Sequence, residues 1–117
     1  MDAACTGRLG EDLALLFYQH SGYTCEARRW RRAGGEADLV LTRPGQLVFV
    51  EVKTRGVGSL GRAVESVPQK QLRRLRMIAR HWCHERGGGG RECRLDVVTV
   101  DLAGEGRGLI LRHFPDQ

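Results

Sequence analysis

The stretch that decides the fold is EADLVLTRPGQLVFVEVK, residues 36–53. On both sides of Pro44 and Gly45, apolar and polar side chains alternate with the period of two that is typical of β-strands. Proline presets its φ angle and glycine tolerates a positive φ, so this pair is typical of a tight turn. The sequence therefore predicts a β-hairpin over these residues.

Acidic side chains face each other across this hairpin. Counted outward from a two-residue loop, Asp38 lies opposite Glu51 and Glu36 lies opposite Lys53, all on one face, although a longer loop would shift this register. Facing Cβ atoms are roughly 4.5–5.5 Å apart, so two carboxylates there repel each other unless a cation lies between them. Mg²⁺ typically takes one or two protein carboxylates and keeps its other positions for water and phosphate oxygens. The pair therefore favours a site for Mg²⁺ or Mn²⁺, and the alternative is an exposed polar face held by salt bridges.

Hydrophobic periodicity divides the rest of the chain into helices and strands. Residues 6–20 have a helical pattern, and so do the residues that follow Pro68, which suits the first turn of a helix. The apolar stripes expected to face the core are Leu9, Leu13, Leu16, Phe17 and His20 in the first helix, and Leu72, Leu75, Ile78, Ala79, Trp82 and Cys83 in the second. Further strands are expected over residues 23–31, 94–101 and 108–114. This order predicts an α/β fold with a mixed central β-sheet, an antiparallel meander plus a crossover strand, flanked by helices.

The length of 117 residues suits one compact domain and not two, so residues 1–117 are expected to form a single domain. Residues 1–5 and 115–117 are expected to fray at its ends. No apolar run approaches the roughly 20 residues of a membrane span, and no secretory signal is visible. These observations favour a cytoplasmic protein.

Positive charge is concentrated in two parts of the chain. The net charge is +5, four arginines fall between residues 28 and 32, and residues 62–94 contain nine basic and three acidic side chains. Such clustering favours a polyanionic partner, with nucleic acid the first candidate, although a solvated basic surface has the same composition.

The four cysteines form no C-x-x-C pair. Without a secretory signal, free thiols are favoured over disulfides. A zinc site built from His81, Cys83 or His84, and Cys93 is an alternative, but its spacing fits no standard structural zinc site.

A longer pattern surrounds the acidic pair. Asp38, followed on the next strand by Glu51-Val52-Lys53, resembles the D…(D/E)-x-K signature of the PD-(D/E)XK nuclease superfamily. Residues 7–14, 35–39 and 48–55, together with the basic helix near Lys70, resemble more closely the YraN-like family of small, predicted endonuclease-like proteins. The resemblance covers nearly the whole chain and implies a restriction endonuclease-like fold, related to that of Holliday junction resolvases.

The resemblance implies an endonuclease that hydrolyses phosphodiester bonds in DNA with Mg²⁺ or Mn²⁺. Asp38 and Glu51 would hold the ion, with the backbone carbonyl of Val52 as a further ligand. Lys53 would position the attacking water or stabilise the transition state. Glu11 would point from the first helix towards the metal, and the alternative is an exposed acid that the helix dipole favours in the first turns.

Resolvase-like members of the superfamily further imply a polar residue of the second helix near the scissile phosphate. Lys70 is the first choice for this position and Gln69 the second. The residues expected to contact nucleic acid are Arg29, Arg31, Arg32, Arg55, Gln69, Lys70, Arg73 and Arg74. The same analogy implies branched or processed DNA as substrate and a possible homodimer. Asp96 is interpreted as a structural or edge residue rather than a further catalytic acid.

Two other functions are compatible with the sequence. A nucleic-acid-binding domain that kept the fold without turnover would bind with a steep salt dependence. An interaction module of a DNA-processing assembly would have no salt-sensitive affinity for nucleic acid. Ligand residues do not by themselves establish turnover, and nothing in the sequence distinguishes DNA from RNA as the partner.

Overall fold

The computed structural model describes residues 3–56, 68–87, 90–102 and 108–117, with side chains from residue 7 onward. Residues 62–67 of the basic segment lie outside the described residues. Within the described ranges the order of elements is α1 (Ala3–His20), β1 (Thr24–Arg32), β2 (Gly35–Arg43), β3 (Gln46–Arg55), α2 (Gln69–Arg86), β4 (Glu92–Leu102) and β5 (Leu109–Phe114). Neither α1 nor α2 has the length and apolar character that a membrane-spanning helix needs.

The strands form one mixed sheet in the order β1-β2-β3-β4-β5. β3 and β4 run parallel, and the other neighbouring strands run antiparallel. A parallel pair needs a crossover connection, and α2 lies in the segment between β3 and β4. Arg43 pairs with Gln46, and pairing continues to Leu39 with Val50, which confirms the predicted hairpin register. Gly45 has the φ of 78° that the turn requires.

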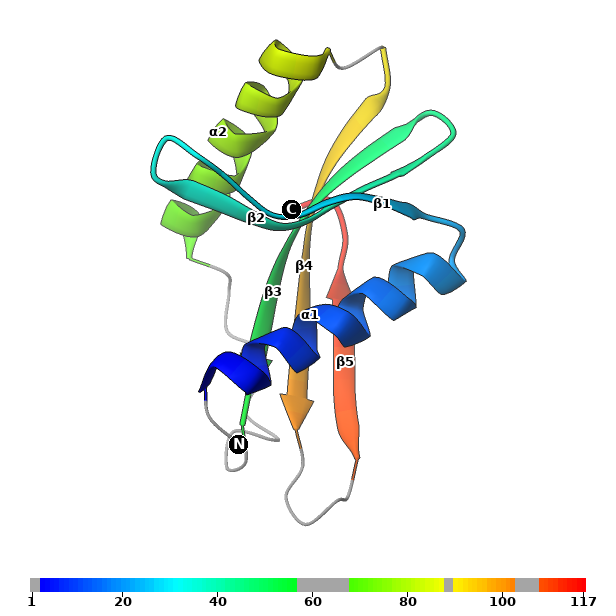
Figure 1. Ribbon diagram of the computed structural model, residues 1–117, viewed down its shortest axis with the longest axis vertical. Helices are drawn as coiled ribbons and strands as arrows, with labels where there is room; N and C mark the ends of the chain where they lie inside the picture. Colours follow the sequence, from blue (N-terminus) through cyan, green and yellow to red (C-terminus); the bar gives the residue numbers. More distant parts are fainter. Residues whose placement is uncertain (1–2, 57–67, 88–89, 103–107) are drawn as a thin grey trace.

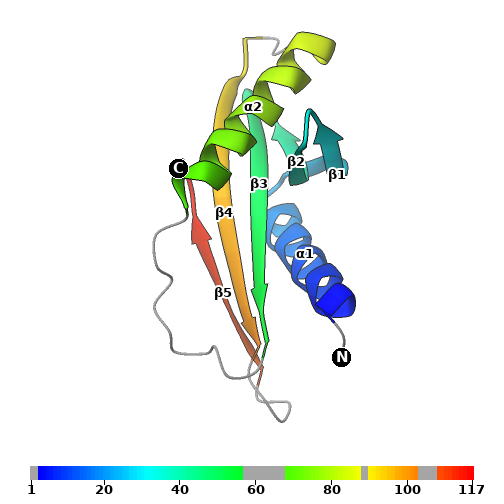
Figure 2. The ribbon, with the colours of Figure 1, turned by 90° about the vertical axis from the view of Figure 1, so that its left-hand side faces the viewer.

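The two helices cover opposite faces of this sheet (Figure 1, Figure 2). The cluster around α1 contains Ala14, Tyr18, Leu39, Leu41, Val48, Val50, Val98 and Val100. The cluster around α2 contains Leu75, Ile78, Trp82, Trp30, Val40, Leu47 and Phe49. The predicted apolar stripe of α2 is confirmed. Because side chains alternate along a strand, residues 38 and 51 belong to the face that α2 covers.

The buried stripe of α1 differs from the predicted one. Gly10, Ala14 and Tyr18 are buried, whereas Leu16 is 62% exposed. A Cβ atom on Gly10 would lie 1.7 Å from Oγ1 of Thr54, so the helix approaches β3 at a distance that only glycine allows. This close approach and the burial of Tyr18 set the rotation of the helix, and apolar periodicity alone carries no signal of either.

Asp96 in β4 is fully buried and joins three elements. Its carboxylate accepts hydrogen bonds from Oη of Tyr18 at 2.7 Å and Nε of Arg94 at 2.8 Å, and lies 2.8 Å from Nε2 of His113. Burial raises the pKa of this carboxyl, but the hydrogen bonds from Arg94, His113 and Tyr18 outweigh burial and lower it. Asp96 therefore has the structural role that was predicted.

The last residues of the chain are bonded to β4. The backbone N–H of Asp116 donates to Oδ1 of Asp96 at 3.1 Å, and that of Gln117 donates to the carbonyl of Leu95 at 2.7 Å. At the other end, α1 already begins at Ala3. The bonds of Asp116 and Gln117 differ from the frayed end expected at 115–117, because backbone bonds to a distant strand leave no periodic pattern in the sequence. Of the frayed end expected at 1–5, residues 1–2 lie outside the described residues.

Candidate functional site

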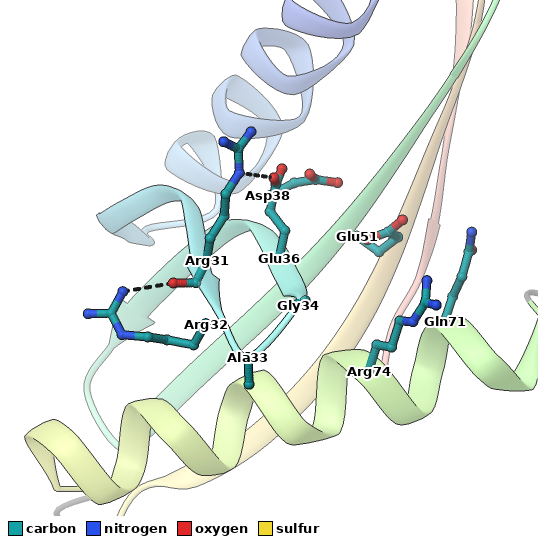
Figure 3. Close-up of a pocket in the computed structure, with 10 residues that line it drawn as sticks. Arg31, Arg32, Ala33, Gly34, Glu36, Asp38, Glu51, Gln71 and Arg74 are labelled. Atoms are coloured by element: carbon teal, nitrogen blue, oxygen red, sulfur yellow. Dashed lines mark hydrogen bonds and ion pairs between the residues drawn. The ribbon is translucent and has the colours of Figure 1, made fainter.

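A pocket of about 600 Å³ opens between the β1–β2 turn and α2 (Figure 3). It is lined by Arg31, Arg32, Ala33, Gly34, Gly35, Glu36, Asp38, Glu51, Gln71 and Arg74. Both members of the predicted acidic pair line this pocket, so the fold brings Asp38 and Glu51 together. In Figure 3, Gln71 and Arg74 extend from α2 toward the strand that carries Glu51.

Asp38 lies where β2 leaves β3. The pairing between β2 and β3 ends at Leu39 and Val50. One residue beyond, Oδ2 of Asp38 accepts a 2.7 Å hydrogen bond from the backbone N–H of Val52. The carboxylate thus takes the place of a ladder carbonyl, and this bond fixes its position relative to β3.

The surroundings of Asp38 make its negative charge unfavourable. Burial, and then the nearby Glu51 carboxylate, raise the pKa of Asp38 to about 8 in spite of the hydrogen bond from Val52. Burial also raises the pKa of Glu51, against the lowering effect of Lys53. The described side chains therefore do not neutralise both carboxyl groups.

Glu36 forms an ion pair with Arg31, not with Lys53 as the extended register suggested. The two residues face each other across β1 and β2, and Nε of Arg31 lies 2.6 Å from Oε2 of Glu36. Burial raises the pKa of Glu36, but hydrogen bonds with Arg31 and Asp38 outweigh burial and lower it. The pKa values of these two neighbouring acids are therefore shifted in opposite directions, that of Asp38 upward and that of Glu36 downward.

Lys53 lies two residues after Glu51 on the same face of β3. Its Nζ atom is 3.8 Å from Oε1 of Glu51, and its side chain is 33% exposed. Val52, between them, contributes the N–H that holds Asp38 and the carbonyl that the sequence suggested as a ligand. The D…(E)-x-K pattern is thus assembled in one place.

Glu11 is directed toward β1 from α1. Oε1 of Glu11 lies 3.0 Å from Nε of Arg29 and 3.6 Å from Nη2 of Arg28, and its side chain is 12% exposed. The exposed-acid alternative therefore does not hold. Glu11 is close enough to add to the rise in the pKa of Asp38, yet its ion pairs are with the arginines. Arg29 has a positive φ of 51°, unusual for a residue other than glycine.

On α2, the residues that line the pocket are not the ones expected from the sequence. Gln69, Lys70 and Arg73 are exposed and are not among the lining residues, whereas Gln71 and Arg74 are. Oε1 of Gln71 is buried and has no hydrogen-bond partner in the part of the chain that the structure describes. The spacing i, i+3 of these two residues beside the apolar stripe is the signal that could have identified them.

Two more of the arginines expected to contact nucleic acid also have acidic partners. Nε of Arg32 lies 3.0 Å from Oε2 of Glu85. Nε of Arg55 lies 3.9 Å from Oδ1 of Asp101. The pair of Arg32 with Glu85 is exposed, and exposed ion pairs contribute about 0–1 kcal/mol, so a phosphate can replace Glu85 at small cost.

The donor set at the pocket suits a hard divalent cation. Carboxylate and carbonyl oxygens are the ligands that Mg²⁺ and Mn²⁺ prefer, and a cation between Asp38 and Glu51 would offset their repulsion. No group of three or more His, Cys, Asp or Glu side chains is arranged to hold a metal among the described residues. A pair of carboxylates is still a sufficient protein contribution for Mg²⁺, which commonly keeps waters and substrate phosphates.

The residues of the zinc alternative form no such cluster in the part of the chain that the structure describes. Sγ of Cys83 and Sγ of Cys93 lie 3.9 Å apart, and both are free thiols. His81 and His84 instead line a shallow surface groove with Met77 and Arg80.

Comparison with known proteins identifies the relatives of this chain. The model of "Uncharacterised protein family UPF0102" matches residues 10–100. A UPF0102 protein of Mycolicibacterium gilvum is 42% identical over 95% of this chain and 91% of its own length. UPF0102 proteins of Clavibacter michiganensis and Moorella thermoacetica are 42% and 40% identical, over 80% and 82% of this chain and 80% of each relative. These matches confirm the YraN-like resemblance at the level of the family, and the chain belongs to the protein family UPF0102.

Proposed function

We propose that this protein is a metal-dependent nuclease that hydrolyses phosphodiester bonds in DNA, with a restriction endonuclease-like fold of the PD-(D/E)XK superfamily. The observation that carries the proposal is the presence of Asp38 and Glu51, both half-buried, in one pocket, with Lys53 beside Glu51. The described side chains do not fully neutralise these two carboxyl groups. A cation from solution would therefore bind favourably between them, next to the cationic side chain of Lys53.

Each residue of the D…(E)-x-K pattern has a defined task in this proposal. Asp38 and Glu51, with the carbonyl of Val52, would hold Mg²⁺ or Mn²⁺, which when bound supplies Lewis-acid activation of the phosphate and of water. The hydrogen bond from Val52 keeps Asp38 at a fixed place for this purpose. Lys53 holds a positive charge beside Glu51, where it orients the attacking water or offsets the negative charge of the transition state.

The opposite wall of the pocket positions the substrate. Arg74 offers a guanidinium, which suits a phosphate because its donors form a planar fork. The carboxamide of Gln71 has a buried oxygen without a partner among the described residues, so it is free to accept a hydrogen bond from water or substrate. Glu11 acts indirectly in this proposal, because it holds Arg29 near the acidic residues of the pocket. Lys70 remains a candidate for contact with the nucleic-acid backbone outside the pocket.

A cleavage panel tests the proposal. Single-stranded, duplex, flap and four-way DNA are incubated with the protein and Mg²⁺ or Mn²⁺. We expect cleavage that Asp38→Asn and Lys53→Ala each reduce by about 100-fold or more, since they remove first contacts to the ion or the reacting groups. Glu26→Gln is the matched control, because Glu26 is an exposed acid bound to Thr42. Cleavage unaffected by the first two substitutions would overturn the proposal.

The same panel distinguishes the residues of α2. Gln71→Ala should lower the cleavage rate by about 10-fold or more, because Gln71 lines the pocket, whereas Lys70→Ala should mainly weaken binding at raised salt. Binding without cleavage of any substrate would favour the catalytically silent nucleic-acid-binding domain. Absence of salt-sensitive binding would favour the interaction module. The preferred DNA structure, a homodimer and a cytoplasmic location remain predictions.

A further inference from the structure

A second group of cations lies on the sheet face that carries Glu51. In the parallel ladder, Lys53 pairs with Thr99 and Arg55 with Asp101. Thr99 in turn pairs with Arg112 of β5. Because side chains alternate along each strand, these five residues project on one face, the face of Glu51. Arg112 was not among the residues that the sequence indicated.

Asp101 holds the two arginines of this group. It is fully buried, and its Oδ2 accepts a 2.9 Å hydrogen bond from Nη1 of Arg112. Its Oδ1 lies 3.9 Å from Nε of Arg55 and has no hydrogen-bond partner within the described ranges. Two guanidinium groups against one carboxylate leave one positive charge over. The hydrogen bond to Asp101 fixes the place of the Arg112 guanidinium before any ligand arrives, and the charge of the same acid attracts Arg55.

The three cations of this group, Lys53, Arg55 and Arg112, are partly exposed to solvent and lie beyond the N-terminal end of α2. The core of α2 packs on Leu47 and Phe49, near the start of β3, and in Figure 2 β3, β4 and β5 continue well past the first turn of this helix. The side chains of Lys53, Arg55 and Arg112 are 33%, 29% and 36% exposed. Successive side chains on one face of a strand are about 7 Å apart, and adjacent strands about 4.8 Å. Lys53 and Arg55 follow Glu51 along one face of β3, and Arg112 lies two strands away on β5, so the three cations share one part of this face.

We propose that Arg55 and Arg112, held by Asp101, bind a phosphate of the nucleic-acid strand next to the one at the Asp38–Glu51 pocket. The inference rests on the proposed function, because it takes the pocket as the place of the scissile phosphate. Arginine suits this task because its planar donors match phosphate oxygens in pairs. The strand then runs from the pocket across β3, β4 and β5, away from α2, and Lys53 stands between the two phosphate positions.

The salt dependence of binding tests this assignment without cleavage. Binding of a fluorescein-labelled single-stranded oligonucleotide is measured by anisotropy in EDTA over a series of KCl concentrations. The slope of log K against log[KCl] is expected to be smaller in magnitude by about 0.7 in Arg112→Gln, because one phosphate contact is lost. Arg55→Gln should show a similar change, and it is the second variant should Arg112→Gln fold poorly.

Two controls separate a phosphate contact from a loss of charge or of structure. Arg43→Gln removes the same charge at the opposite end of the hairpin, where Arg43 packs on Tyr23, and should leave the slope unchanged. Arg112→Lys keeps the charge and should retain most of the slope. An unchanged slope in both Arg112→Gln and Arg55→Gln, or equal changes in Arg43→Gln, would overturn the assignment. So would a wild-type protein that does not bind the oligonucleotide.

The two experiments distinguish a wrong phosphate position at Arg55 and Arg112 from a wrong nuclease proposal. Metal-dependent cleavage that requires Asp38, together with an unchanged salt slope in the arginine variants, would remove this phosphate position and leave the nuclease proposal intact. A slope that falls in the arginine variants, with no cleavage in any metal, would support the phosphate position and point to a binding domain.

Discussion

Asp38 is the residue whose protonation state links the fold to the proposed chemistry. It is held by the N–H of Val52 and repelled by Glu51, and its pKa rises to about 8 because burial and that repulsion disfavour the charge. A divalent cation reverses this balance, since it favours the ionised carboxylate. Binding of the cation below pH 8 would therefore release a proton.

The first prediction concerns Asp38→Asn in the absence of metal. In the unfolded chain Asp38 ionises from about pH 4, but in the folded protein only near pH 8. The folded state binds more protons in this interval, so the contribution of Asp38 to the free energy of unfolding decreases as pH rises from about 4 to 8. We expect the variant to have a Tm about 4 °C or more above wild type at pH 8.5, and a similar Tm at pH 5.

Addition of metal gives the complementary measurement. Mg²⁺ or Mn²⁺ should raise the Tm of the wild type more at pH 8.5 than at pH 5, because binding requires the ionised carboxylate. Asp38→Asn should show little of this rise. An equal rise in both proteins would mean that the ion binds elsewhere and would contradict the assignment of Asp38 as a ligand.

At the scale of elements, the contact of α1 with β3 determines where Glu11 lies. Gly10 precedes Glu11 and packs directly on Thr54, one residue after Lys53. The helix can approach the strand because position 10 has no side chain, and Glu11 is thereby brought close enough to influence Asp38. The packing of α1 and the electrostatics of the site are therefore coupled through one glycine.

The second prediction compares two glycines of the same helix. Gly→Ala normally stabilises a helix by about 1 kcal/mol. At Gly7 nothing lies within 4 Å of the new Cβ, so Gly7→Ala should increase the free energy of unfolding by up to about 1 kcal/mol. At Gly10 the new Cβ would lie 1.7 Å from Oγ1 and 2.9 Å from Cβ of Thr54, so Gly10→Ala should decrease it by about 1–3 kcal/mol.

Urea unfolding followed by circular dichroism measures both variants. Opposite signs for the two substitutions are the expected result. If Gly10→Ala were as stabilising as Gly7→Ala, the close approach of α1 to β3 would be wrong, and the position of Glu11 would have to be reconsidered.

At the scale of the whole molecule, one sheet separates two clusters of buried side chains. Neighbouring residues of β2 and β3 contribute to opposite clusters: Leu39 and Val50 pack under α1, and Val40 and Phe49 pack under α2. Neither cluster can form without the strands that also build the other. The two layers are therefore expected to fold together.

The third prediction follows from this shared sheet. Unfolding in urea should be a single transition, with the same midpoint by far-ultraviolet circular dichroism and by tryptophan fluorescence. Both tryptophans, Trp30 and Trp82, lie in the cluster under α2, so fluorescence reports on that side alone. A fluorescence midpoint clearly separate from the circular dichroism midpoint would show that the two sides unfold independently, contrary to the single domain expected.

The sequence predicted the parts of this molecule that depend on local pattern. Alternation and the turn residues were enough for the β2–β3 register, and helical spacing was enough for the buried face of α2. The pairing of Asp38 with Glu51 in one pocket followed from that register. These features depend on neighbours in the chain, where periodicity is informative.

The features that the sequence did not reveal depend on contacts between distant segments. The rotation of α1 depends on the fit of Gly10 against Thr54, and the order of the C-terminal residues depends on bonds to Asp96 and Leu95. The entry of Gln71 rather than Lys70 into the pocket depends on how α2 lies across the sheet. The local pattern of apolar and polar residues carries no information on these contacts between distant segments.

The bond between Asp38 and the N–H of Val52 has a consequence for the choice of ion. Because the carboxylate of Asp38 is anchored to Val52 of β3 while its own strand turns away, the gap between Asp38 and Glu51 is set by β3 and not by the angle at which the β1–β2 ribbon departs. Ions differ in the gap they need: Mg²⁺ binds oxygen at about 2.0–2.1 Å and Ca²⁺ at about 2.3–2.6 Å. The local geometry of one strand would thus determine which ionic radius fits, and substitutions at the far β1–β2 turn, remote from either acid, would leave the metal preference unchanged.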